Sequence, residues 1–169
     1  MSAESKPGRD KRGKKSRARS AARLAAVQAL YQMEMAGTPV AQIIPEFESY
    51  RFGEEMDGLA LDEADPDYFE RIMRGVIANQ VEIDQLTDKV LAEGWPLARV
   101  DNTLRALFRA GGFELMGSGD VPVKVVIDEY LHIAHAFFFG DEPGLVNGVL
   151  DSFARARGLT STEDQGAPQ

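Results

Sequence analysis

The side chains near the start of this chain that are best suited to bind a ligand are arginines, followed by one tyrosine. Arg19 and Arg23 are four residues apart, so in a helix they project from one ridge, and Tyr31 lies about 80° around the helix from Arg23. Guanidinium groups bind phosphates and aromatic rings stack on unpaired bases, so this arrangement suits single-stranded RNA. Tyr31 also continues an apolar stripe with Leu24 and Val27, and a place in the core is the alternative for it.

A second aromatic feature is the Phe-Phe-Phe run at 137–139. Three consecutive side chains of a helix point in different directions and cannot all face one core, so at least one of them is expected to be exposed. Asp141 and Glu142 follow just before Pro143, where a new helix is predicted to begin. Carboxylates at that position meet unpaired backbone N–H groups, so capping is the simplest role for both.

Residue patterns typical of enzymes and cofactor sites are missing from the sequence. His132 and His135, with Glu129 one turn earlier, can share a helix face, but the spacing is not that of a zinc protease and no third nitrogen or sulfur ligand exists. A nucleophile elbow, a phosphate-binding loop and a dinucleotide fingerprint are also missing. We therefore expect a protein that is not an enzyme and that needs no metal or cofactor.

The cellular compartment follows from what the composition lacks. The chain has no cysteine, which excludes a disulfide framework and favours a reducing environment. No apolar run is long enough to span a membrane, and the N-terminus lacks the apolar part of a secretion signal. We expect a cytoplasmic protein without a membrane partner.

Charge is distributed unevenly along the chain. The net charge is −8, yet residues 1–23 hold nine basic and two acidic side chains, a balance of +7, and the remainder holds 10 basic and 25 acidic side chains, a balance of −15. A basic segment on an acidic body is typical of proteins that contact nucleic acid, because phosphates provide most of the non-specific affinity. A tail that only improves solubility is the alternative.

Hydrophobic periodicity predicts helices over most of residues 17–157, the part of the chain that carries the candidate binding residues. Apolar side chains recur at three- and four-residue steps over residues 17–37, 38–50, 66–94, 96–117, 122–138 and 143–157. Pro45 should interrupt the second of these helices, Asn79-Gln80 should break the third, and an acidic loop joins them over residues 53–67. The prediction is an all-α domain of about six or seven helices over residues 17–157, with a disordered basic arm (1–16) and a polar tail (158–169).

Two segments carry residues that are unusual in helices. Residues 121–127 are rich in the β-branched side chains typical of strands, but Pro122 suits a first helical turn and the apolar spacing continues to Leu131, so a helix is preferred. Gly111 and Gly112 lie inside another predicted helix, where each costs roughly 1 kcal/mol relative to alanine. Their presence predicts a close crossing with a neighbouring helix.

Several of these segments together resemble the NusB family of bacterial transcription antitermination factors. The matching stretches are Ala18-Arg19 to Arg23 with Ala26-Val27-Gln28-Ala29-Leu30-Tyr31, Leu104 to Arg109 with Phe113-Glu114-Leu115, Asp120 to Glu129, and Leu145-Val146-Asn147-Gly148-Val149-Leu150-Asp151. They occur in the family's order between Ala18 and Arg157. The resemblance implies two packed helical subdomains that bind the boxA sequence of nascent ribosomal RNA together with ribosomal protein S10 (NusE). With other Nus factors on RNA polymerase, the complex would suppress termination.

The resemblance also implies which residues bind RNA. Carried over position by position, the RNA surface comprises Arg17, Arg19, Arg23, Tyr31, Phe137 and Asp141. The chain departs from the family at Phe138, where many relatives have glycine, at His135, where a lysine is common, and at Leu145, where a phenylalanine is common.

Two alternatives come from other functional classes. RNA cytosine methyltransferases carry a domain that is similar to NusB, but such an enzyme needs a further domain with a cysteine nucleophile, and this chain has no cysteine. A helical protein–protein adaptor whose basic arm is incidental is the other alternative. Salt-dependent RNA binding separates the adaptor from the RNA-binding protein.

Overall fold

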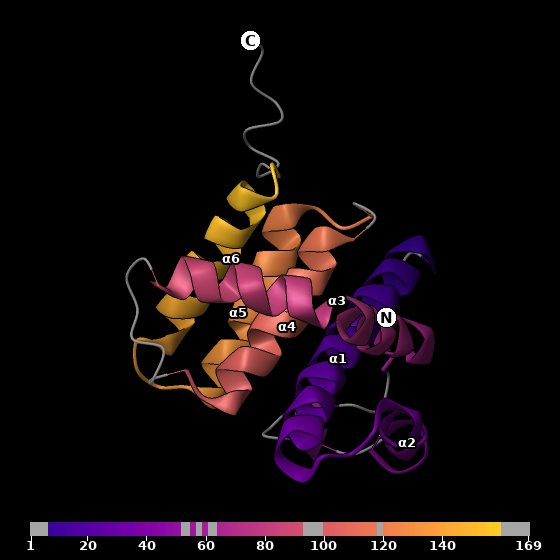
Figure 1. Cartoon of the computed structure of the whole chain (residues 1–169). Helices are drawn as coiled ribbons and strands as arrows, with labels where there is room; N and C mark the ends of the chain where they lie inside the picture. The colour runs from indigo at the N-terminus through magenta and orange to yellow at the C-terminus, as the bar shows by residue number, and fades with distance from the viewer. Residues whose placement is uncertain are drawn as a thin grey trace.

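Helices make up most of the computed structural model, which describes residues 7–51, 55–56, 59–60, 64–92, 100–117 and 120–159 (Figure 1). In chain order the helices are α1 (Pro7–Ala36), α2 (Val40–Glu46), a π-helical turn η1 (Phe47–Arg51), α3 (Pro66–Ala92), α4 (Asn102–Met116), α5 (Val123–Phe137) and α6 (Glu142–Ala156). Two short strands, β1 (Glu55–Met56) and β2 (Leu59–Ala60), pair in antiparallel fashion. The predicted all-α fold is confirmed. The ribbon, made of two strands of two residues each, is a small addition within the predicted acidic loop.

The helix α4 lies at the centre of the packing. It contacts α1 and α3 as well as α5 and α6, while α5 and α6 also pack on each other. In Figure 1, α1 and α2 lie to one side of α4, and α5 and α6 lie to the other. One cluster of buried apolar side chains runs through all of these helices, so the elements that carry the predicted RNA residues share a core.

The start of α1 differs from the sequence prediction. The helix begins at Pro7, so residues 7–16, which were expected in a disordered arm, are helical. Lys and Arg are good helix formers, and adding turns to a helix already anchored by buried side chains avoids the unfavourable nucleation step. Residues 1–6 and 160–169, which belong to the predicted arm and tail, lie outside the described residues. At its other end α1 stops at Gly37, whose φ of 71° suits glycine, as predicted.

The third helix is continuous where a break was predicted. Asp65 caps it, because its side chain accepts hydrogen bonds from the backbone N–H groups of Asp67 (3.0 Å) and Tyr68 (3.1 Å). The predicted break at Asn79-Gln80 is wrong, since α3 continues to Ala92. The Asn79 amide donates to the backbone oxygen of Gly75 (2.8 Å), which satisfies this polar side chain inside the helix.

Close helix crossings explain the glycine pair of α4. A Cβ atom on Gly111 would lie 3.0 Å from the Leu150 side chain of α6, and one on Gly112 would lie 3.0 Å from Ile83 of α3. The predicted crossing is therefore confirmed, and it involves two neighbouring helices.

The remaining expectations concern single elements. Residues 123–137 form the helix α5 directly after Pro122, so the preference for a helix over a strand is confirmed. Pro45 lies in the last turn of α2, and the π-helical turn η1 follows, which agrees with the predicted interruption. Of the predicted acidic loop, residues 53–54, 57–58 and 61–63 lie outside the described residues. No helix in the described part of the chain is both long and apolar enough to cross a membrane.

Candidate nucleic-acid interface

A groove separates the N-terminal half of α1 from the start of α5. Its volume is about 270 Å³, and its lining comprises Lys15, Ser16, Arg19 and Arg23 from α1 together with Val121, Val125 and Glu129. Lys15 and the neighbouring Arg17 are exposed, and Arg19 is half-buried. Cationic side chains on one wall and valines on the other suit a ligand that carries phosphates and flat apolar groups.

Arg19 is held by an aromatic ring. Its guanidinium carbon lies 4.7 Å from the centre of the Tyr68 ring on α3, within the range of a cation–π contact. Its Nε is buried and has no hydrogen-bond partner among the described residues. The ring therefore fixes the position of the guanidinium group without neutralising its charge, which leaves Arg19 able to bind an anion in the groove.

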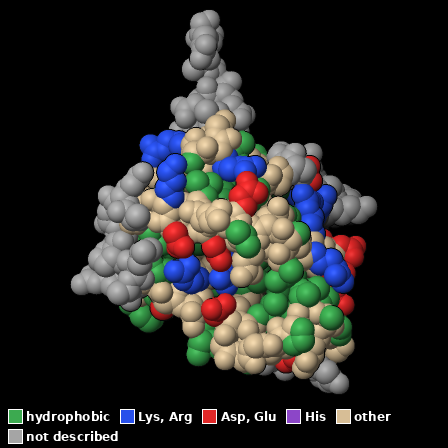
Figure 2. Space-filling view, viewed as in Figure 1, with side chains coloured by type: hydrophobic (Ala, Val, Ile, Leu, Met, Phe, Trp, Pro, Cys, Tyr) green, Lys and Arg blue, Asp and Glu red, His purple; other side chains and the backbone are tan. Residues whose placement is uncertain are grey.

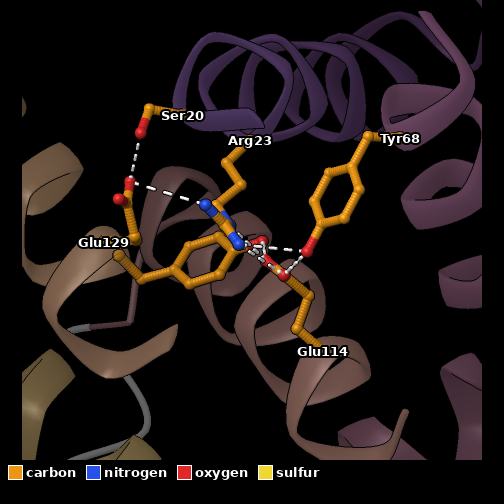
Figure 3. Close-up of polar contacts among 6 residues, drawn as sticks. Ser20, Arg23, Tyr68, Glu114 and Glu129 are labelled. Carbon is orange, nitrogen blue, oxygen red and sulfur yellow. Dashed lines mark hydrogen bonds and ion pairs between the residues drawn. The ribbon is translucent and has the colours of Figure 1, made fainter. Parts of the chain in front are cut away.

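Arg23 is placed differently, in a buried polar cluster that joins four helices (Figure 3). Only 3% of its side chain is exposed, and its Nε and Nη2 donate to the two carboxylate oxygens of Glu114 on α4, at 2.8 and 3.0 Å. Nη2 also donates to the Tyr68 hydroxyl at 3.0 Å. Glu114 accepts two further hydrogen bonds, from the hydroxyl of Tyr130 on α5 (2.5 Å) and from that of Tyr68.

This placement does not suit the RNA contact that the sequence predicted for Arg23. The charge of Arg23 is already compensated by Glu114, and a buried bidentate pair is not released to a ligand without a large penalty. Glu129 of α5 adds a second carboxylate, 3.6 Å from Nη1 of Arg23, and accepts a hydrogen bond from Ser20 at 2.7 Å. Arg23 thus fastens α1 to α4 and α5. It holds the two walls of the groove in place, while its own charge is taken up by the carboxylates.

Burial and the Glu114 carboxylate shift the titration of this cluster. Burial lowers the pKa of Arg23, but the hydrogen bond and charge of Glu114 outweigh it, so the pKa is raised overall. Burial and the negative charge of Glu114 raise the pKa of Tyr68 from 10.0 to about 12, and they raise the pKa of Tyr130 well above its usual value. Both hydroxyls therefore remain protonated donors at neutral pH.

The raised tyrosine pKa values predict a loss of stability at high pH. A group whose pKa rises from 10.0 to about 12 on folding stabilises the protein fully below pH 10, and this contribution disappears as the pH rises toward 12. The loss from Tyr68 should be on the order of 3 kcal/mol. Urea unfolding measured between pH 9 and 12 should show Tyr68→Phe losing less stability than the wild type over this window. Tyr31→Phe, outside the cluster, serves as the control, and parallel profiles for Tyr68→Phe and the wild type would contradict the assignment.

Tyr31 lies further along α1. Its side chain is 37% exposed, which does not fit the alternative of a core residue. It follows Arg19 by twelve residues, which corresponds to about 18 Å along a helix. The basic groove and Tyr31 are thus separate points on α1, at a distance that several nucleotides of an extended strand would cover.

The turn between α5 and α6 carries the other predicted residues. Phe137 and Phe138 are partly buried against the core, whereas Phe139 is 99% exposed, which confirms that one aromatic of the run faces solvent. Asp141 is exposed at the N-cap of α6, but its side chain makes no capping hydrogen bond, so the predicted capping role is not observed. This turn follows the C-terminal end of α5, away from the groove at its N-terminal end.

Two surface residues were missed by sequence reasoning. Lys15 precedes Arg19 by four residues, so the ridge that was identified from Arg19 and Arg23 extends one turn toward the N-terminus. That spacing was a usable signal. Phe139 had none, because the sequence does not show which aromatic of three the core accepts.

Two other features of the surface bear on the site. His132 and His135 are both exposed, and the described residues contain no cluster of three or more side chains that could bind a metal ion. On the face in Figure 2, positively and negatively charged side chains lie interspersed. Elsewhere in the described residues, the buried Arg109 pairs with Asp84 of α3 (3.0 Å), and Arg157 pairs with Glu82 (2.6 Å).

Comparison with known proteins finds similar sequences and similar solved structures. Residues 20–155 match the model of the NusB family. The transcription antitermination protein NusB of Allorhizobium ampelinum is 53% identical over 137 residues, which is 81% of this chain and 86% of that protein. The same protein of Agrobacterium fabrum is also 53% identical over 137 residues, 81% of this chain and 83% of its own length. Among solved structures, T. maritima NusB superposes with a TM-score of 0.67 at 28% identity, covering 88% of this chain and 97% of that one.

Proposed function

The chain belongs to the NusB family, and on this premise we propose that it is a transcription antitermination factor that binds boxA in nascent ribosomal RNA. It does so together with ribosomal protein S10 (NusE), and the complex joins other Nus factors and RNA polymerase in the cytoplasm to suppress termination. The observation that carries the RNA-binding part is the groove with Lys15 and Arg19 on one wall and the exposed Arg17 beside it.

The phosphates of the RNA are bound along α1. Lys15, Arg17 and Arg19 offer three positive charges within five residues, with Arg19 fixed against Tyr68. Positive side chains that neutralise phosphates supply affinity that falls as salt rises. Arg23 contributes through the cluster with Glu114, which fixes the orientation of α1.

Unpaired bases stack on exposed aromatic side chains. Tyr31 offers a partly exposed ring on α1, and the turn before α6 offers Phe139, with Asp141 two residues later. A ring with both faces accessible stacks on any base, and a carboxylate accepts hydrogen bonds from the amino groups of bases. The family resemblance favoured Phe137 as an RNA contact. Its ring instead packs on the core, so it supports the turn.

Substitutions in this turn separate packing from RNA contact. Phe139→Ala should weaken boxA binding by roughly 5- to 150-fold, the range for loss of one stacked base, and should leave the melting temperature unchanged. Phe137→Ala should instead lower the melting temperature, because it removes a ring packed on the core. Fluorescence anisotropy and thermal unfolding of both variants test this. A Phe139→Ala protein with wild-type affinity would remove the stacking role from this residue.

The negative charge of most of the chain supports a basic protein partner. Outside residues 1–23 the chain carries a balance of −15, which repels RNA but attracts a basic ribosomal protein. A gel shift with boxA RNA in the presence and absence of S10 tests the proposal. S10 should raise the RNA affinity of the chain. Equal affinity with and without S10 would contradict the joint complex. A chain that binds S10 but does not bind RNA would favour the adaptor.

A further inference from the structure

Three guanidinium groups surround the ring of Tyr68. Those of Arg19 and Arg23 come from α1, with their central carbons 4.7 and 5.1 Å from the ring centre. The third belongs to Arg71 on α3, at 6.0 Å. Because Arg19 and Arg71 both lie against one ring, the positive surface of α1 is continuous with a positive side chain of α3.

Arg71 differs from Arg23 in its surroundings. Its side chain is 43% exposed, and its Nη1 lies 3.4 Å from Oδ2 of Asp120, whose side chain is 56% exposed. Exposed ion pairs of this length contribute little stability, since water and salt screen them. A phosphate that approaches Arg71 can therefore replace Asp120 at small cost, whereas it cannot replace Glu114 at Arg23.

The segment that carries Asp120 also lies beside the groove. Val121 lines the groove along α1, and it lines as well a small cavity of about 20 Å³ next to Tyr68 and Arg71. Asp120 and Val121 thus stand between the two positive regions. An RNA strand that leaves the groove on this side meets Arg71 next.

We propose that Arg71 is a further phosphate contact for the RNA, which extends its path from α1 across Tyr68 to α3, and that Asp120 competes with the RNA for Arg71. This inference rests on the proposed RNA-binding function and adds a residue and an internal competitor to it. The Asp120 carboxylate is paired with Arg71 in the free protein, and this pair breaks when RNA binds. Arg71 therefore increases the affinity of the protein for RNA, and Asp120 reduces it.

The test measures boxA RNA affinity at several salt concentrations for Arg71→Gln, Asp120→Asn and the double variant. Arg71→Gln should weaken binding about 3- to 10-fold and reduce the slope of log affinity against log salt by about 0.7, the value for one phosphate of a single strand. Asp120→Asn should strengthen binding by a similar factor. In the Arg71→Gln background the same Asp120→Asn change should have a much smaller effect, because the competition needs the arginine.

The exposed pair Arg155 and Asp151 on α6, 3.1 Å apart, provides a matched control. Arg155→Gln and Asp151→Asn should leave the salt slope unchanged. A wild-type slope for Arg71→Gln, or an equal gain from Asp120→Asn with and without Arg71, would overturn the inference while boxA binding by the wild type remained intact. Failure of the wild type to bind boxA RNA would overturn the proposed function itself, and this inference with it.

Discussion

Glu114→Ala is expected to lower the free energy of unfolding by about 3 to 5 kcal/mol, because it leaves the charge of Arg23 buried without its carboxylate. The Tyr68 and Tyr130 hydroxyls lose their acceptor in the same step. Urea unfolding at pH 7 measures the change. Glu70→Ala, which removes the exposed i, i+4 pair with Arg74, is the matched control and should change the free energy by no more than about 0.5 kcal/mol. Similar values for the two variants would contradict a structural role for the cluster.

The same cluster predicts how Arg23→Ala affects RNA. The variant should unfold more easily, yet the fraction that remains folded should bind boxA RNA with an unchanged salt slope, since Arg23 neutralises Glu114 and not a phosphate. A slope reduced by about 0.7 would return Arg23 to the RNA surface.

Replacing both Lys15 and Arg19 by alanine should weaken RNA binding about tenfold or more, with a salt slope reduced by about 1.4 for two phosphates. The stability of the protein should change little, because Lys15 is exposed and the described residues hold the Arg19 guanidinium group by a cation–π contact, which is weak. Lys89→Ala, an exposed lysine in the last turn of α3, is the control for net charge. A double variant with the affinity and slope of the Lys89 variant would exclude the groove as the phosphate site.

Periodicity was sufficient for most of the fold. The apolar spacing through Leu131 outweighed the β-branched content of residues 121–127, and the Gly111-Gly112 pair correctly indicated a close crossing. The start of α1 was missed because residues 7–16 contain almost no apolar side chains, so their composition resembles a disordered segment. Helix extension from a packed helix needs no apolar face of its own.

The candidate site was less predictable, because burial depends on residues that are distant in sequence. Arg19 and Arg23 share one ridge, but Arg23 is structural because it pairs with Glu114, which lies 91 residues later in the chain. Arg71 belongs to no motif, and it lies near α1 because Arg71 and Arg19 both contact the ring of Tyr68. Spacing identifies side chains that share a face, but it does not identify the carboxylate that faces them.

The most direct test of the central claim compares the affinity of the chain, with S10 present, for a boxA RNA and for an RNA of the same length and composition with the boxA order scrambled. We predict that boxA binds at least about tenfold more tightly and that the affinity for both RNAs falls as salt rises, with the steepness set by phosphate contacts on α1. Equal affinity for the two RNAs, or binding that does not change with salt, would contradict the claim.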